Sequence, residues 1–310
     1  MKTLSLEKSL KNEILMRMTV DPKAHLTNKV ETKLRVSNQF MANSQELPKI
    51  PIFDLSTKPL NPTSNSWLCK KVQHALEEYG FFIARYENVS SELDEQVFDV
   101  LEELFDLPLE TKARNTSDLV FYGYVGQLPH APLHESMGIP EATTINAVQS
   151  FTNLMWPSGH NTFCESIHSY AKLVSELEQI VDRLVFESYG AHKHYESHVN
   201  GLQVQLRNGE WISVDVPPGT FVVMAGDAYE AWSNGRILAA RHQVVMEGDK
   251  PRYCLALFSF NHGATHIPEE LVDSDHPLQY GPFDNFGLAR FYLSGAAQMT
   301  ESTAKAYCGC

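Results

Sequence analysis

The feature that most constrains the fold is a change of hydrophobic period near residue 190. From about Phe163 to Tyr189, apolar residues recur at helical spacing, and Gly190 is a natural helix end. Beyond it, short apolar runs alternate with turn residues, and Asn208-Gly209 is a typical hairpin signal. The strands predicted there are Leu202–Leu206, Trp211–Val214, Thr220–Met224, His242–Met246 and Tyr253–Phe260.

The first half of the chain mixes helices and strands. We expect strands at Ile50–Leu55 and Phe81–Tyr86, and helices at Ser66–Tyr79 and from Ser90 or Ser91 to Leu107. Residues 116 to 162 look irregular, and Pro268–Leu271 and Phe286–Leu293 are late helices. Helices followed by strands indicate an α+β fold with a double-stranded β-helix (jelly-roll) core and supporting amino-terminal helices. Because a jelly roll needs about eight strands, this barrel is incomplete.

Residues 1–46 have no sustained period and are expected to form a poorly ordered extension. Their basic and hydroxyl-rich composition leaves an organelle transit peptide open, but Glu7, Glu13 and Asp21 disfavour it. The division predicted is 1–46 as the extension, 47–162 as an amino-terminal α/β region, and 163–310 as the long helix with a truncated jelly roll.

The charge of the chain limits the classes of partner, and its cysteine content indicates the compartment. The formal net charge of -13 disfavours binding to nucleic acid and to anionic membranes, so a small-molecule partner is expected; the oligomeric state stays open. Five cysteines without disulfide or zinc-knuckle spacing favour a reducing compartment. Because no apolar run approaches the ~18 residues of a membrane span and no signal peptide is recognisable, a cytoplasmic location is expected.

Several ordered motifs resemble one family. The amino-terminal motifs are Ile50-Pro51-Ile52-Phe53-Asp54-Leu55, Glu78-Tyr79-Gly80-Phe81-Phe82 and Glu103-Leu104-Phe105-Asp106-Leu107-Pro108 followed by Lys112. The carboxyl-terminal motifs are Val199-Asn200-Gly201-Leu202-Gln203-Val204, Gly209-Glu210-Trp211-Ile212, Gly226-Asp227, Asn234-Gly235-Arg236, His242, and Arg252-Tyr253 before Leu257-Phe258-Ser259. Together they resemble the plant iron(II)/2-oxoglutarate-dependent dioxygenases, and most of all the branch that modifies glucosinolate side chains.

This resemblance implies Fe(II) and 2-oxoglutarate as cofactors, with ascorbate as reductant, and oxidation of a small specialised metabolite. His242 matches the second histidine ligand of the family's iron centre, on a strand expected to aim it into the barrel. Arg252 matches the clamp for the distal carboxylate of 2-oxoglutarate, which a planar guanidinium can grip at two points. Cys254 stands where the family has a serine, and because a thiol is the weaker donor, co-substrate binding should be looser.

The family's His-x-Asp step, which supplies the other two iron ligands, is missing. Only eleven residues separate Gly190 from Leu202, too few for the strands that carry this step in the family. Losing even an outer-shell partner of a metal site costs about 10–100-fold, so losing two ligands should cost far more. No residue is therefore assigned a catalytic role.

Local substitutes are His194-Tyr195-Glu196, which has the form of a His-x-Glu step, and a zinc site built from His192, His194 and His198. The alternative is a polar helix tail that lies off any strand. Elsewhere, Cys308-Gly309-Cys310 allows a metal or redox pair but fits a frayed terminus equally. Trp156, Phe121, Tyr122 and Tyr124 either line a pocket mouth or simply pack.

Two functional hypotheses remain. The chain is either an impaired dioxygenase that splits 2-oxoglutarate, or a non-catalytic binding or decoy protein, including the product of a truncated or alternatively spliced reading frame.

Overall fold

The fold is that of a computed structural model, which describes most of the chain between residues 50 and 310 and one segment before it. The described residues are 10–19, 50–56, 66–118, 121–127, 134–186, 194–197, 201–245, 252–261, 263–294, 300 and 302–310.

Helices and strands alternate in the first half, and strands dominate the second. The strands are β1 (Leu10–Thr19), β2 (Ile52–Asp54), β3 (Phe81–Arg85), β4 (His134–Ile139), β5 (His194–Ser197), β6 (Leu202–Gln205), β7 (Trp211–Ser213), β8 (Thr220–Met224), β9 (His242–Val244), β10 (Arg252–Asn261), β11 (Ala264–Thr265) and β12 (Phe283–Asp284). The helices are α1 (Ser66–Glu78), α2 (Ser91–Phe105), α3 (Leu109–Lys112), α4 (Ile145–Met155), α5 (Asn161–Phe186), α6 (Asp227–Trp232), the 3-10 helix η2 (Glu269–Leu271), α7 (Asn285–Leu293) and α8 (Thr303–Cys308).

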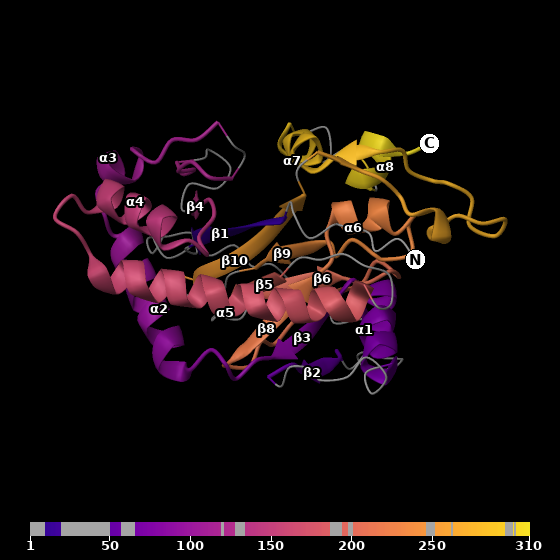
Figure 1. The fold of residues 1–310 in the computed structure, drawn as a ribbon, viewed down its shortest axis with the longest axis horizontal. Helices are drawn as coiled ribbons and strands as arrows, with labels where there is room; N and C mark the ends of the chain where they lie inside the picture. The colour runs from indigo at the N-terminus through magenta and orange to yellow at the C-terminus, as the bar shows by residue number, and fades with distance from the viewer. Residues whose placement is uncertain are drawn as a thin grey trace, which may run out of the picture.

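A seven-stranded sheet organises the molecule, in the order β2-β3-β8-β5-β10-β1-β4. Helices α1, α2 and α5 cover one of its faces, with α5 crossing the sheet in Figure 1, and they enclose the largest core cluster. A second cluster joins β3 and β8 to β6 and β7 of a three-stranded sheet, β7-β6-β9. The described strands thus form two facing open sheets of a jelly-roll core, and the predicted α+β class and incomplete barrel are confirmed.

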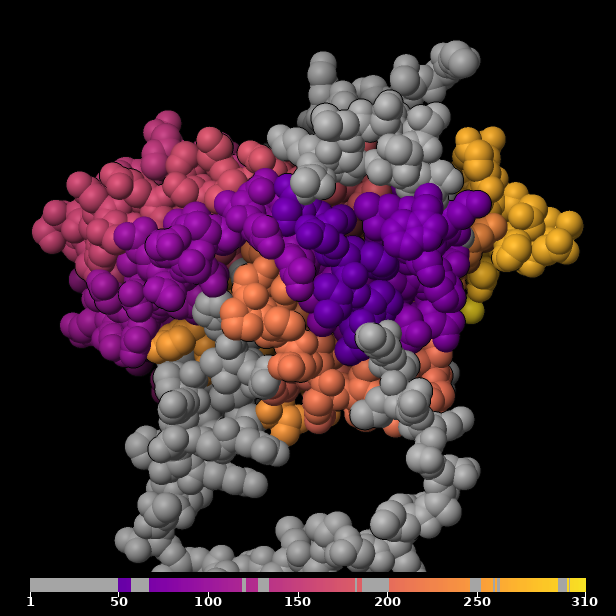
Figure 2. Space-filling view, turned by 90° about the horizontal axis from the view of Figure 1, so that it is seen from below, coloured from indigo at the N-terminus to yellow at the C-terminus, as the bar shows by residue number. Residues whose placement is uncertain are grey.

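The two predicted regions on either side of residue 162 share one core. The largest cluster contains residues from Phe53 in β2 to Leu257 in β10, including the inner face of α5. In Figure 2 the indigo-to-purple amino-terminal residues run across the middle of the visible face, beside orange residues of the second half. The amino-terminal region therefore acts as a packing layer for the sheet.

Local signals predicted these elements well. Ser90 caps α2, its hydroxyl accepting a hydrogen bond from the Leu93 amide, and Gly80 follows α1 with a φ of 76°. The Asn208-Gly209 turn joins β6 to β7 with Gly209 at a φ of 85°. The long helix, the late helices and the five predicted strands all form, with shifts of a few residues at their ends.

Four segments contradict the sequence-based expectations. Leu10–Thr19, assigned to a poorly ordered extension, is a ten-residue strand, because it pairs with β10 on one edge and with β4 on the other. The stretch 116–162, expected to be irregular, contains β4 and α4. His194–Ser197 forms β5 instead of a helix tail, because it pairs with β8 and β10 on either side. The terminus does not fray, because the Cys310 amide donates to the Gln279 carbonyl at 2.9 Å.

Strand β4 is attached to the helical layer by a buried ion pair. Lys112 Nζ lies 2.8 Å from the Glu135 carboxylate and donates to the Phe105 carbonyl at 2.6 Å. Met137 and Ile139 of the same strand are fully buried in the main core. Because both charges are buried and paired, breaking this contact would leave a costly unpaired charge.

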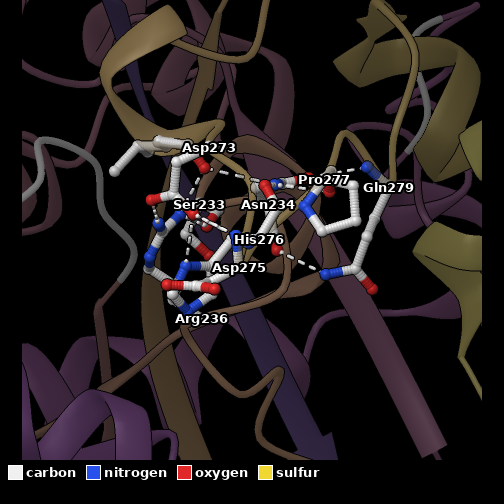
Figure 3. A network of polar contacts seen from close by, with 9 residues as sticks. Ser233, Asn234, Arg236, Asp273, Asp275, His276, Pro277 and Gln279 are labelled. Atoms are coloured by element: carbon white, nitrogen blue, oxygen red, sulfur yellow. Dashed lines mark hydrogen bonds and ion pairs between the residues drawn. The ribbon is translucent and has the colours of Figure 1, made fainter.

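The residues after β11 are anchored to α6 through Asn234, as Figure 3 shows. Its side-chain amide donates to the carbonyls of Leu271 and Pro277 at 3.2 and 3.1 Å, and its oxygen accepts from the Gln279 amide at 2.8 Å. Asn234 itself has a φ of 54°, which asparagine tolerates better than most residues. One buried side chain thus replaces backbone pairing for this irregular segment.

Glu178 is a buried carboxyl on α5. It is 3% exposed, and its Oε1 makes no hydrogen bond. Burial raises the pKa of Glu178 to about 8. The folded protein therefore holds this group protonated at neutral pH.

No helix in the described ranges is both long and apolar enough to cross a membrane. The described cysteines form no disulfide.

Replacement of Asn234 should destabilise the fold in two separable steps. We expect Asn234→Gly to cost about 2–4 kcal/mol, because it removes the hydrogen bonds to the Pro277 carbonyl and from the Gln279 amide. Asn234→Ala should cost roughly 1 kcal/mol more, because alanine is strained at this positive φ. Urea unfolding of both variants measures the difference, and equal stabilities of the two would contradict the assigned backbone strain.

Glu178 should make stability fall as pH rises from about 4.5 to about 8. Across this window the unfolded chain loses the proton while the folded chain keeps it, so the free energy of unfolding drops by up to a few kcal/mol. Glu178→Gln should remove this slope and stabilise the protein at pH 8. Glu165→Gln, the same change at an exposed position of α5, is the control for urea unfolding at several pH values. A slope that survives in Glu178→Gln would refute the assignment.

Candidate functional site

Strand β10 turns one face to the core and the other to the candidate site, because its side chains alternate in direction. Leu255 and Leu257 belong to the core beneath the helices, and the Tyr253 ring lies 6.3 Å from the Phe105 ring of α2. This burial, with Glu102 and Asp106 nearby, raises the pKa of Tyr253 to about 12. Because strand residues alternate in direction, the even-numbered residues of β10 face away from the helices.

The two predicted co-substrate residues lie on that second face. Arg252 is the first residue of β10 and is 4% exposed. Cys254 follows two positions later and is partly buried. A buried guanidinium next to a thiol offers several donors to an anion, and the guanidinium carries most of the binding capacity. The two residues therefore lie on one face of one strand.

Phenylalanine rings extend this face toward the end of β10. Phe258 and Phe260 stack with centroids 6.1 Å apart, and Phe260 stacks on Phe286 of α7 at 5.1 Å. Phe121 stacks on Phe258 at 6.2 Å. The face thus changes from cationic at Arg252 to aromatic. Phe258 and Phe260 were not predicted as site neighbours, although their positions six and eight residues after Arg252 put all three on the same face of a strand.

His242 lies on the other sheet. It begins β9, opposite Val204 of β6, and β9 is the outermost described strand of its sheet. Its Nδ1 lies 2.9 Å from the Ala240 carbonyl, which assigns the proton to Nδ1 and makes Nε2 the acceptor of the neutral ring. Histidine ligands of metals commonly make this second contact. His242 shares the sheet face of its partner Val204, which is buried between the two sheets, and it is exposed on that face at the edge of the described sheet.

Within the described residues, no group of three or more histidine, cysteine or acidic side chains could hold a metal ion. His194 and Glu196 stand opposite Leu257 and Leu255 of β10, at register positions of the helix-facing side. A His-x-Glu step at these positions belongs to the face opposite Arg252. His192 and His198 lie outside the described residues. The residues placed by the structure therefore do not fit an iron centre.

The other aromatic candidates are not part of this face. Trp156 packs on Phe163, with ring centroids 4.8 Å apart, at the junction of α4 and α5. Tyr122 is buried. Tyr124 donates a short hydrogen bond to Glu135, and burial together with this contact raises the pKa of the Tyr124 hydroxyl. These three residues serve packing.

Within the terminal cysteine pair, Cys308 has little nucleophilic character. Burial, with Cys310 nearby, raises the pKa of Cys308 to about 11, so its thiol stays protonated near neutral pH. Its sulfur donates to the Ala304 carbonyl at 3.2 Å, as expected for a helix-end side chain. The geometry favours a structural role for Cys308.

Two family profiles match the chain. The profile described as "non-haem dioxygenase in morphine synthesis N-terminal" matches residues 50–137, and that of the "2OG-Fe(II) oxygenase superfamily" matches residues 192–261. The second match contains β5 to β10, and with them His242, Arg252 and Cys254.

Similar proteins are dioxygenases. The chain is 32% identical to "Probable 2-oxoglutarate-dependent dioxygenase AOP1" of Arabidopsis thaliana, over 84% of this chain and 95% of the relative. It is 27% identical to "Probable inactive 2-oxoglutarate-dependent dioxygenase AOP2" of the same plant, over 84% and 97%. The crystal structure of the dioxygenase for auxin oxidation from rice superposes with a TM-score of 0.69 at 25% identity, over 84% of this chain and 100% of that one.

Proposed function

We propose a function from one premise: this chain belongs to the plant 2-oxoglutarate-dependent iron(II) dioxygenases, in the AOP branch. Members of this family couple oxidation of a small molecule to the decarboxylation of 2-oxoglutarate. We infer that this chain still binds 2-oxoglutarate and that its oxygenase activity is impaired or lost.

One observation carries the loss of activity. A non-haem iron centre of this kind needs two histidines and a carboxylate on one face of the metal. The described residues contain no three-membered set of suitable ligands, and His242 is the one residue matching the family's ligands. A single imidazole binds Fe(II) too weakly to keep it in place for turnover.

A shortened chain explains the missing ligands. Only fifteen residues, 187–201, separate the end of α5 from the start of β6, and the family's His-x-Asp step belongs in this interval. The alignment with AOP1 spans 311 positions but uses only 84% of this 310-residue chain. AOP1 therefore has positions without a counterpart here, which supports an internal deletion.

The co-substrate half of the site supports retained binding. Arg252 is buried on a strand that is paired at both edges, so its backbone position is fixed before a ligand arrives. The distal carboxylate of 2-oxoglutarate fits such a group through two parallel hydrogen bonds. Cys254, on the same face, is the second contact in our assignment.

The expected ligand class is a small organic molecule, as for the rice relative, whose name gives auxin oxidation. The phenylalanine face beside Arg252 suits an apolar or aromatic molecule of plant specialised metabolism. We place the protein in the cytoplasm, where thiols such as those of this chain stay reduced.

The alternative is a purely non-catalytic role as a binding or decoy protein, or as the truncated product of an active dioxygenase gene. If the purified protein shows no turnover, the missing iron ligands favour this alternative. Sequencing the transcript across the His198 codon would identify an omitted exon.

Purified protein with Fe(II), ascorbate and 2-oxoglutarate should release succinate no faster than its His242→Ala variant. The reason is that neither form assembles three metal ligands. Succinate is measured by mass spectrometry, with an active dioxygenase as positive control. Turnover well above the variant, with stoichiometric Fe(II) binding by calorimetry, would overturn the assigned loss of activity.

Cys254→Ser should strengthen 2-oxoglutarate binding by roughly 2–10-fold, because a hydroxyl donates a stronger hydrogen bond than a thiol. Arg252→Lys should weaken binding, because an ammonium cannot make the two-point contact. Isothermal titration with 2-oxoglutarate measures both, and Arg290→Lys, an exposed position on α7, is the matched control. Unchanged affinity in Arg252→Lys would remove Arg252 from the site.

A further inference from the structure

Strand β1 is an interior strand of the main sheet although it comes from the amino-terminal extension. It pairs antiparallel with all ten residues of β10, from Leu10 opposite Asn261 to Thr19 opposite Arg252. On its other edge, six residues pair with β4. Figure 1 shows this indigo strand beside the orange β10.

This strand is not part of the matched family regions. Those regions are 50–137 and 192–261, and residues 10–19 lie outside both. The chain is also short of strands between α5 and β6, where one strand of four residues, β5, is described. A segment from the extension therefore contributes a strand to the sheet of a chain that has too few.

The two strands beside β1, which are β10 and β4, are each held in place by contacts that do not involve β1. β10 pairs with β5 on its far edge and packs Leu255 and Leu257 into the core. β4 is fixed by the Lys112–Glu135 ion pair and by the buried Met137. If β1 left, two rigid strand edges would face one another with their backbone donors and acceptors exposed.

The connection permits insertion within the same chain. Thirty residues, 20–49, separate β1 from the first described residue before β2. Such a length spans far more than the width of a sheet, and loop-closure entropy rises only slowly with length.

We propose that residues 10–19 are a replacement strand, inserted in cis into a strand-acceptor slot between β10 and β4. The slot binds an extended segment mainly through backbone hydrogen bonds, so it accepts a strand from outside the matched family regions. When β1 fills the slot, it pairs with the backbone of β10 along the stretch that includes Arg252 and Cys254. This pairing orders the face on which the two side chains lie.

The register supplies a direct test with a native cysteine. Arg17 stands opposite Cys254, and opposed residues on antiparallel strands have Cα atoms about 4.5–5.5 Å apart, within disulfide reach. In full-length Arg17→Cys, mild oxidation should link residues 17 and 254 within a monomer. Met18→Cys, whose register partner is Tyr253 on the other face, is the matched control and should not link to Cys254.

Peptide mapping and non-reducing electrophoresis read out the result. Failure of Arg17→Cys to link, or equal linking by Met18→Cys, overturns the placement of the strand. A 17–254 link found only in covalent dimers overturns insertion in cis and assigns the strand to a second copy.

A deletion of residues 1–20 provides an independent measurement. Hydrogen exchange at β10 and β4 should accelerate by about tenfold or more, and a peptide of residues 8–21 should restore protection. A scrambled peptide of the same composition is the control. Unchanged exchange in the deletion variant would overturn the proposal; if that variant does not fold, the cross-link in the full-length chain decides.

Discussion

The paired backbone of β10 is the constraint on which the rest of the structure depends. Its two edges bond to β1 and β5, one of its faces closes the core beneath the helices, and the other presents Arg252, Cys254 and the phenylalanines. Because a strand has a fixed two-residue period, a slip of one residue would send the guanidinium into the apolar core. Core packing therefore fixes the register, and the register fixes the chemistry of the face.

The parts of the fold that were predictable are those governed by local signals. Gly80, the Ser90 cap and the Asn208-Gly209 turn each determine a boundary through the conformation of a few residues. The strands β1 and β5 could not be derived this way. β5 is only four residues long and reads as polar, and it is a strand because β8 and β10 offer their edges on both sides. Pairing between distant segments decides such elements, and local propensity does not reveal it.

The candidate site likewise has parts that the sequence predicts and parts that depend on contacts between distant segments. Arg252, Cys254 and His242 were chosen because they match family motifs, and the structure places the first two on one face of β10. The exposure of His242 was not predictable, because it depends on whether another strand lies beside β9. The motif Asn234-Gly235-Arg236, noted only for its resemblance, owes its importance to geometry: its positive φ values let one amide reach three carbonyls and the backbone amide of Gln279.

The fold and the metal centre have different requirements, which is why one can persist without the other. A sheet accepts any segment with a suitable alternation, because its bonds are made by the backbone, which all sequences share. An iron centre needs an imidazole or carboxylate at each of three positions, within tenths of an ångström. A strand recruited from an amino-terminal extension can satisfy the first requirement and leave the second unmet. The proposed function rests on this difference: it assigns to this chain a retained core and a retained Arg252, with the oxygen chemistry lost.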